Sequence, residues 1–404
     1  MKILMVIHRF YSNNGTELYA YKVGKELINK GHDVSLLCHD VTWGLGKSTC
    51  EHRNYDGIHV YRYIKPRYAK DAWACVRDRE IEHAYKLLMN FEFDIVHFFH
   101  FYGLSVSLTN ITKKRKIPYF ISLADMLGIC PRNLYIDKYT ICDKKIDSHD
   151  CAVCLEKLEP LIGTAGVKDS YGTYDSIKKH ISDRLGAFDY ALSNAYRVLS
   201  PSNYLKYEYQ KNFNVDIEVN PLGIHSTDLN VTRKSSGVLT FGYIGVIHPT
   251  KKCDIIMEEL YKVPGQCKLF LYGLCHNINE LNEIIIDDRV EYKGQFHHRD
   301  LSSVLESIDM LIVANEVESY SIVHRECKAV GIPIIAPSHG VFIESIRHMK
   351  DGLLYDKGCL NQVIKQVINN PRLVDKLSVI EKQKTIQEDV DYLEGLYSES
   401  LAER

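Results

Sequence analysis

The chain has 404 residues, more than one hydrophobic core usually holds, so two domains of ordinary size are expected. Its formal net charge of −2 and isoelectric point of about 6.8 exclude a strong overall attraction to nucleic acid or anionic membranes. The apolar opening, Met1 to Phe10, is shorter than a signal peptide, and no apolar stretch is long enough to span a bilayer. With twelve cysteines, these features predict a cytoplasmic protein in a reducing compartment.

Strand-like and helix-like segments alternate along the first half of the chain. Lys2 to His8, Glu17 to Asn29 and Val34 to Cys38 have the apolar spacing of a strand, a helix and a strand. The rhythm continues in strands Asp94 to Phe98, Pro118 to Leu123, Arg197 to Ser200 and Asp216 to Val219, and in helices Leu104 to Lys114 and Pro201 to Lys211. The polar, cysteine-rich stretch at about 125–160 is interpreted as an insertion. A parallel sheet covered by helices on both faces explains this order.

A second alternation follows residues 225–237, which have the composition of a linker. Its predicted strands are Leu239 to Tyr243, Lys268 to Tyr272, Val290 to Tyr292, Met310 to Val313 and Ile332 to Ile335, and its predicted helices are Cys253 to Tyr261 and Ile322 to Val330. The predicted domains are therefore 1–224 and 238–380, with a C-terminal helix, 381–404, packing back on the first domain. The fold class is α/β, with two Rossmann-like doubly wound domains facing each other across a cleft that binds ligands.

Two glutamates, Glu318 and Glu326, lie eight residues apart around a predicted helix start with Ser321 as its N-cap. A helix N-terminus attracts anions, so we expect a diphosphate at Ser321, Ile322 and Val323. Glu326, more than one helical turn after this helix start, would accept hydrogen bonds from ribose hydroxyls. Two isolated acids at a loop and at a solvated helix position are the alternative.

Polar residues also lie near the ends of predicted strands in the first half. Gly15 and Thr16 follow the first strand, where a residue without a side chain lets the backbone approach a ligand. No G-x-G-x-x-G pattern accompanies them, which disfavours a nicotinamide dinucleotide. His97 and His100 are candidates for contact with an acceptor or sugar, with packing among phenylalanines as the alternative. Asp125 is a candidate acid or base, or else the cap of a turn.

Four cysteines form a dense cluster: Cys130, Cys142, Cys151 and Cys154. Four thiolates are the ligand number of tetrahedral zinc, and the last two cysteines have the usual paired spacing. We predict a structural zinc ion. The first two cysteines are too far apart for a standard ribbon, so His149 as a ligand and an iron–sulfur cluster remain alternatives.

The basic run from Lys113 to Lys116 lies at a predicted helix end. Positive charge complements the helix dipole there, so a solvated helix terminus is the first interpretation. A weak peripheral contact with a membrane surface is the alternative.

Several motifs, in this order along almost the whole chain, resemble those of retaining glycosyltransferases with the GT-B fold, glycosyltransferase family 4 and glycosyl transferases group 1. They are Asn14 to Glu17, Gly31 to Val34, Phe241 to Lys251, Glu318 to Pro333 and the block that contains Gly340, Glu344 and Asp351 to Leu354. A cysteine-rich insert resembles that of a subset of these enzymes.

The resemblance implies a donor site in the second domain. It places Glu326 on the donor ribose and Glu318 near the donor sugar. It assigns Lys251 to the leaving diphosphate, within a phosphate-binding loop that includes Gly245 and Lys252. Fixed cations and amides lower the barrier to departure of the diphosphate, so no cofactor is expected for catalysis.

The implied reaction is transfer of a hexose from a UDP- or GDP-sugar to a glycan or lipid-linked acceptor, with retention, in the biosynthesis of cell-surface polysaccharide. Departures from the family pattern occur at Ala124 (usually histidine), Val246 (usually arginine) and Ser321 (usually glycine). Two alternatives therefore stay open: a catalytically inactive subunit that binds sugar nucleotide or glycan, and a nucleotide-sugar epimerase.

Overall fold

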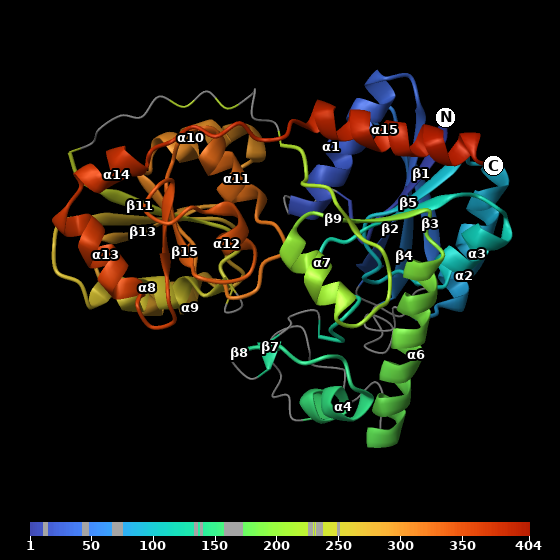
Figure 1. Ribbon diagram of the computed structural model, residues 1–404, viewed down its shortest axis with the longest axis horizontal. Coiled ribbons are helices and arrows are strands. Elements are labelled where there is room, and N and C mark those ends of the chain that lie inside the picture. The colour runs from blue at the N-terminus through green and yellow to red at the C-terminus, as the bar shows by residue number, and fades with distance from the viewer. Residues whose placement is uncertain are drawn as a thin grey trace. The chain divides into compact units, whose positions relative to one another are not determined.

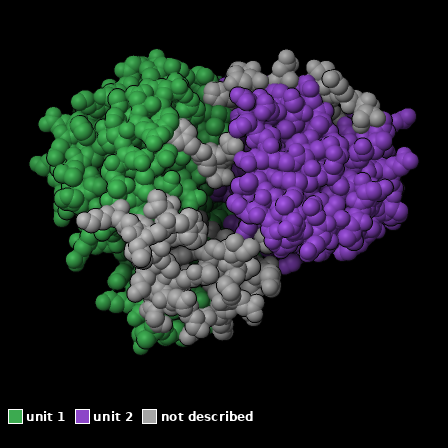
Figure 2. Space-filling model, turned by 180° about the vertical axis from the view of Figure 1, so that it is seen from behind, with its two compact units in different colours: residues 1–222, 386–404 green, residues 223–385 purple. Residues whose placement is uncertain are grey.

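A computed structural model describes residues 1–10, 15–42, 48–66, 76–132, 136–137, 140–156, 173–224, 229, 231, 237–248 and 251–404. The chain forms two compact units, coloured separately in Figure 2. The first consists of Met1–Leu222 with Ile386–Arg404, and the second of Gly223–Thr385. The predicted linker, 225–237, lies mostly outside the described residues. None of the helices in the described ranges has the length and apolarity needed to cross a membrane.

The first unit contains an eight-stranded sheet in the order β10-β9-β6-β5-β1-β2-β4-β3. Its strands are β1 (Lys2–Val6), β2 (Asp33–Thr42), β3 (Thr49–Tyr55), β4 (Ile58–Pro66), β5 (Ile95–Phe98), β6 (Tyr119–Ser122), β9 (Arg197–Ser200) and β10 (Glu218–Val219). All neighbouring strands are parallel except β3, which pairs antiparallel with β4. The direction of winding reverses between β1 and β5, so the carboxyl ends of these two strands form the switch point at which such sheets bind ligands.

Helices flank this sheet (Figure 1). They are α1 (Gly15–Asn29), α2 (Arg79–Leu88), α3 (Leu108–Lys114), α6 (Tyr174–Ser193), α7 (Asn203–Gln210) and α15 (Ile386–Ala402), with a short 3₁₀ helix η1 (Met89–Phe91) after α2. The C-terminal helix α15 packs beside α1. Its buried Asp389 accepts hydrogen bonds from the Tyr19 hydroxyl at 2.7 Å and from Asn220 Nδ2 at 2.9 Å. These bonds satisfy a carboxylate that would otherwise be costly to bury.

The cysteine-rich region adds no strand to the main sheet among its described residues. It forms a separate two-stranded ribbon, β7 (Ile136–Asp137) and β8 (Thr140–Ile141), and the helix α4 (Ser148–Glu156). Ala152 and Leu155 of α4 pack against Ile177 and Ile181 of α6 in a small core of their own. This core fixes α4 to the first unit.

The second unit contains a six-stranded parallel sheet in the order β13-β12-β11-β14-β15-β16. Its strands are β11 (Thr240–Ile244), β12 (Lys268–Tyr272), β13 (Val290–Gly294), β14 (Met310–Ile312), β15 (Ile334–Pro337) and β16 (Gly352–Tyr355). Counted along the chain, this order is the 3-2-1-4-5-6 arrangement of doubly wound sheets, with its switch point between β11 and β14.

Apolar residues of this second sheet alternate between two cores. Met310 and Ile312 of β14 face one core, and Leu311 faces the other. The helices are α8 (Cys253–Tyr261), α9 (Ile278–Ile284), α10 (Leu301–Glu306), α11 (Ile322–Ala329), α12 (Val341–Ser345), α13 (Leu360–Asn369) and α14 (Arg372–Leu377), with the 3₁₀ helix η4 (His298–Asp300). The first core includes residues of α8, α13 and α14, and the second includes residues of α10, α11 and α12. Because side chains alternate along a strand, both faces of the sheet are covered.

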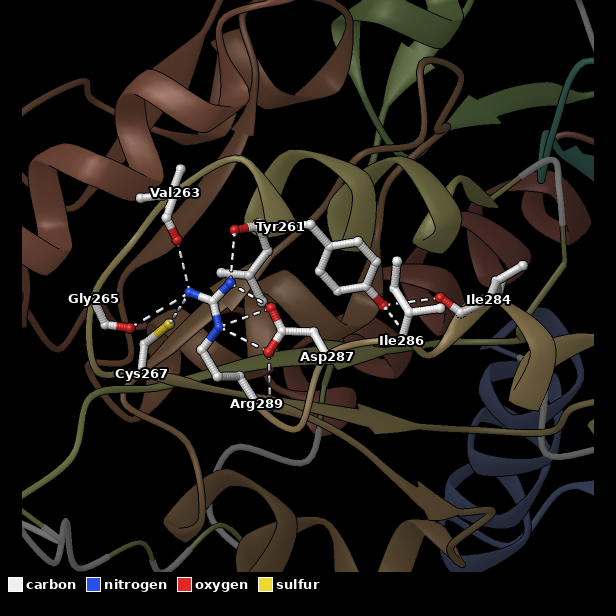
Figure 3. A network of polar contacts seen from close by, with 9 residues as sticks. Tyr261, Val263, Gly265, Cys267, Ile284, Ile286, Asp287 and Arg289 are labelled. Atoms are coloured by element: carbon white, nitrogen blue, oxygen red, sulfur yellow. Dashed lines mark hydrogen bonds and ion pairs between the residues drawn. The ribbon is translucent and has the colours of Figure 1, made fainter.

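One arginine closes the end of α8 (Figure 3). The Arg289 guanidinium donates to the carbonyl oxygens of Leu260 at 3.2 Å and Val263 at 2.7 Å, and it pairs with Asp287. The last carbonyls of a helix lack partners within the helix, so this side chain satisfies groups that would otherwise stay unpaired.

Candidate functional site

At the switch point of the second sheet, two lysines meet two glutamates. Lys251 and Lys252 follow β11, and Glu316 and Glu318 follow β14. Lys251 Nζ lies 2.9 Å from Glu318 Oε2, and Lys252 Nζ lies 2.6 Å from Glu316 Oε1. The fold therefore brings the predicted residues Lys251, Lys252 and Glu318 together. The partner Glu316 is a residue that the sequence did not single out.

Glu318 is held more firmly than its lysine. Asn315 Nδ2 donates to Glu318 Oε2 at 2.8 Å, and the Glu318 side chain is 18% exposed. The Lys251 side chain is 41% exposed. A flexible, half-exposed lysine can exchange one anionic partner for another, whereas the carboxylate stays in place.

The backbone at the end of β11 lies close to that of β12. Gly273 has φ of +142°, and a Cβ there would lie 1.8 Å from the carbonyl oxygen of Gly245. Only glycine fits this contact. The close approach fixes the start of the loop that leads from Gly245 to Lys251.

The N-terminus of α11 lies where the sequence predicts, but Ser321 does not cap it as expected. Its φ is 59°, in the left-handed region, and its side chain makes no capping hydrogen bond to the described helix. The amides of Ile322 and Val323, both half-buried, begin the helix. Lys252, the N-cap of α8, also has a positive φ, 55°. The left-handed conformation explains the glycine that the resemblance leads one to expect at the position of Ser321.

Glu326 is 2% exposed, in the second turn of α11. Its Oε1 lies 2.6 Å from His298 Nε2, so one carboxylate oxygen already has a protein partner. His298, which follows β13 in η4, was not predicted from the sequence. Its place beyond a strand end was a possible signal, but its pairing with α11 depends on the packing of the sheet.

In the first unit, two histidine–carboxylate pairs lie at the switch point. His8 Nε2 lies 3.1 Å from Glu17 Oε1, and His100 Nε2 lies 2.9 Å from Asp125 Oδ2. The two imidazole rings are 4.1 Å apart. The Tyr102 amide donates to His100 Nδ1 at 3.0 Å, so Nε2 is the nitrogen that donates to Asp125. Burial and the neighbouring His100 lower the pKa of His8.

Asp125 caps a turn and also pairs with His100. Its Oδ1 accepts the Leu127 amide at 2.8 Å, as a turn cap does, while its Oδ2 accepts from His100 and the side chain stays 32% exposed. His8 and Glu17 were not predicted as site residues, although Glu17 belongs to one of the quoted motifs and His8 follows the first strand.

His97 does not lie beside His100. It is fully buried, its Nδ1 is 2.6 Å from the Tyr397 hydroxyl, and its Nε2 is 2.8 Å from Ser122 Oγ. Burial lowers its pKa to about 3. Packing in the core therefore explains this histidine, which has no exposed surface for an acceptor. Gly15 and Thr16 form the start of α1, and the neighbouring Asn14 of the motif lies outside the described residues.

The four clustered cysteines line a single pocket beside α4. No disulfide joins these four described cysteines, and Arg132 Nη1 lies 3.6 Å from Cys154 Sγ. Burial, together with the neighbouring thiols, raises the pKa of Cys151 to about 12. Within the described residues, no group of three or more His, Cys, Asp or Glu side chains is arranged to hold a metal ion. The structure thus gathers the thiols without closing a metal site around them.

The two doubly wound sheets define the class: this is an α/β protein with the GT-B fold. Sucrose-phosphate synthase from Thermosynechococcus elongatus matches it with a TM-score of 0.67 and 15% identity, over 98% of this chain and 96% of that chain. HepE from Anabaena in complex with UDP matches with a TM-score of 0.64 and 14% identity, over 100% of both chains. At these identities the likeness establishes the fold.

Two family models match the sequence, "Glycosyltransferase Family 4" at residues 13–135 and "Glycosyl transferases group 1" at residues 239–370. The chain belongs to the glycosyltransferases that combine these two domains, which confirms the predicted family. An uncharacterized glycosyltransferase from Methanocaldococcus jannaschii is 20% identical over 379 residues, 87% of this chain and 84% of that protein. A D-inositol 3-phosphate glycosyltransferase from Mycobacterium tuberculosis is 26% identical over 120 residues, 28% of this chain and 25% of that protein.

Proposed function

We propose that this glycosyltransferase moves a hexose from a UDP- or GDP-sugar to a glycan or lipid-linked acceptor, with retention, in the cytoplasmic steps of cell-surface polysaccharide synthesis. The observation that carries this proposal is the arrangement at the switch point of the second sheet. There, Lys251 and Lys252 lie on one side and Glu316 and Glu318 on the other. HepE of Anabaena, which shares the fold, binds UDP, and this gives the proposal further support.

In the proposed reaction, Lys251 neutralises the diphosphate as it leaves. It reaches the diphosphate by giving up its contact with Glu318, which Asn315 keeps in place. The exchange costs little, because Lys251 is already half-exposed and the diphosphate carries more negative charge than one carboxylate. The amides at the start of α11 supply further positive potential. Glu318, released from the lysine, then lies near the developing positive charge of the sugar.

Glu326 binds the donor ribose in this proposal. His298 holds one of its oxygens and thereby orients the carboxylate. On the acceptor side, the exposed Asp125, oriented by His100, takes the role of acid or base. It would replace a function of the family's histidine, whose position is Ala124 here.

Calorimetry with UDP and GDP tests the donor site. Glu326→Ala removes hydrogen bonds that are made equally in the ground and transition states, so nucleotide binding should weaken by about 1.5 to 3 kcal/mol. Glu283→Ala, an exposed position on α9, is the matched control and should bind as the parent protein does. If Glu326→Ala binds both nucleotides as well as this control, the proposed donor site is wrong.

A specific observation favours a second candidate, a subunit that binds sugar nucleotide without transferring the sugar. Each of the described lysines of the donor site is already paired with a carboxylate. Transfer or hydrolysis of a donor identified by a thermal-shift screen separates the two functions. In the enzyme, Lys251→Ala should reduce turnover more than it weakens binding of a nucleoside monophosphate. In the binding subunit, neither the parent protein nor the variant turns over the donor.

We also propose that the four clustered thiols hold a structural zinc ion. Their common pocket and the absence of a disulfide among these four described cysteines support this proposal. Coordination would require the thiol side chains to rotate toward one centre. Metal analysis should find about one zinc per chain, lost in Cys151→Ser and retained in Cys50→Ser, an exposed cysteine outside the cluster. Absence of zinc and iron, with all four thiols titratable in the native state, would contradict it.

A further inference from the structure

A basic hollow of about 520 Å³ lies in the first unit between α2 and α3. Four cations from three segments line it: Arg77 before α2, Lys86 within α2, Lys114 at the end of α3 and Arg115 directly after it. The dipole of a single helix end would explain the two α3 residues alone. It does not explain why cations from other segments surround the same space.

The charge of this hollow is largely uncompensated. Its one acidic lining residue, Glu82, accepts hydrogen bonds from Arg77 Nε at 3.2 Å and from Ser107 Oγ at 2.5 Å. Four cations and one carboxylate leave a formal charge of +3 in the lining. Among the residues that the structure describes, neither Lys86 nor Lys114 pairs with an acidic side chain. Like charges held this close repel one another, and a bound anion would relieve the repulsion.

Arg115 is held in position before any ligand arrives. Its Nη1 donates to the Met89 carbonyl at 3.1 Å, and its Nη2 donates to Asn90 Oδ1 at 3.2 Å and to the Lys86 carbonyl at 3.4 Å. A guanidinium has five N–H donors in one plane. Three of these donors are used in this way, which leaves two N–H groups for a ligand.

We propose that this hollow is a binding site for a phosphate group, separate from the donor site and independent of the proposed transfer reaction. Lys86 and Lys114 supply positive charge on flexible side chains. Arg115, which is held in place by its hydrogen bonds, orients the phosphate group. The phosphate belongs either to a soluble anion or to a lipid headgroup. Leu87 and Phe91, 58% and 54% exposed, follow Lys86 in the same segment and would contact the acyl chains in the second case.

The test compares two double variants of equal charge in the full-length protein. Lys86→Gln with Lys114→Gln removes both mobile cations of the hollow. Lys113→Gln with Lys116→Gln removes two exposed lysines of the same basic run that do not line it. Inorganic pyrophosphate is titrated by calorimetry, and hydrogen exchange locates its binding. Phosphatidylcholine vesicles with and without phosphatidylglycerol are tested by co-sedimentation.

We expect the first double variant to lose about tenfold or more in affinity for at least one probe, and the second to stay within about twofold of the parent protein. Binding should weaken with added salt and protect residues 77–90 and 107–115 from exchange. Loss confined to pyrophosphate identifies a soluble anion, and loss confined to phosphatidylglycerol vesicles identifies a lipid. If both double variants bind both probes equally, or if the parent protein binds neither, the proposal is wrong.

Discussion

Ser321 and Lys252 hold the backbone in the left-handed region, with φ of 59° and 55°. Residues with a Cβ pay about 1 kcal/mol or more in this conformation. Both residues immediately precede a helix of the proposed donor site. Two of the six non-glycine residues with positive φ in the described part of the chain therefore lie at these helix starts.

Ser321→Gly should stabilise the second unit by about 1 kcal/mol, because glycine adopts this φ without strain. Ser321→Ala keeps the Cβ and loses no capping hydrogen bond, so its stability should stay close to that of the parent protein. Chemical denaturation of both variants measures the difference. A glycine variant no more stable than the alanine variant would show that the surroundings already compensate the strain.

Asp125→Asn should reduce sugar transfer by about a hundredfold while donor affinity stays unchanged, if the carboxylate acts on the acceptor. The amide keeps an oxygen for the Leu127 amide and so preserves the turn. Asp143→Asn, an exposed aspartate of the insertion, serves as the control. Rates are measured with saturating donor and acceptor. Unchanged turnover in Asp125→Asn would reduce this residue to a turn cap.

At the scale of elements, most strands of the two large sheets could be predicted, but β3, β4 and β16 could not. Residues Ile3 to Val6 of β1 are completely buried, so the strand appears in the sequence as an unbroken apolar run. β3 is exposed at most of its positions and antiparallel, so no apolar pattern marks it. The short strand β16 begins at Gly352, where a Cβ would lie 2.6 Å from the Ile334 carbonyl oxygen. Its glycine reflects close packing, which local sequence does not reveal.

The sequence indicated which residues of the candidate site follow strands, but not which of their side chains contact one another. Lys251 and Glu318 were identified because each follows a strand and belongs to a motif. Their contact depends on β11 and β14 being neighbours, although β12 and β13 lie between them in the sequence. For the same reason, the pairing of His298 with Glu326 is visible only in the folded chain.

Arg289→Met should destabilise the second unit by about 3 kcal/mol, because it leaves helix carbonyls and Asp287 without their partner. The Arg289 side chain is only 18% exposed, so water replaces these contacts poorly. Arg299→Met removes an arginine that is 81% exposed, and the change should stay below about 0.5 kcal/mol. Denaturant unfolding compares the two. Equal losses would mean that the cap at the end of α8 adds nothing.

At the scale of the whole molecule, buried histidines make the first unit sensitive to acid. Burial lowers the pKa of His39 to about 4 and that of His97 to about 3. Above pH 6.5 these imidazole rings are neutral in both the folded and the unfolded state, so the unit has its full stability. As the pH falls, the unfolded state takes up protons that the folded state does not, so stability is lost until the folded pKa is reached.

Lowering the pH from 7 to 5 should therefore cost about 2 kcal/mol for each of these two histidines. Denaturation curves at the two pH values measure the loss. His39→Asn keeps a donor toward the His8 carbonyl and should remove the part of this stability loss that His39 causes. His52→Gln, at an exposed position, should not change the pH dependence of stability. A loss that is the same in His39→Asn and the parent protein would rule out His39 as a source.

The C-terminal helix α15 gives the chain an unusual order of folding during synthesis. Residues 1–222 leave the ribosome before Asp389 and Tyr397, the buried partners of Tyr19 and His97, have been made. Residues 223–385 contain the whole second unit, so all of it is synthesised before the helix that completes the first unit. Domains generally complete their folding in the order in which they are synthesised. In this protein the first unit begins to be synthesised first, but it cannot be completed until the second unit has also been synthesised.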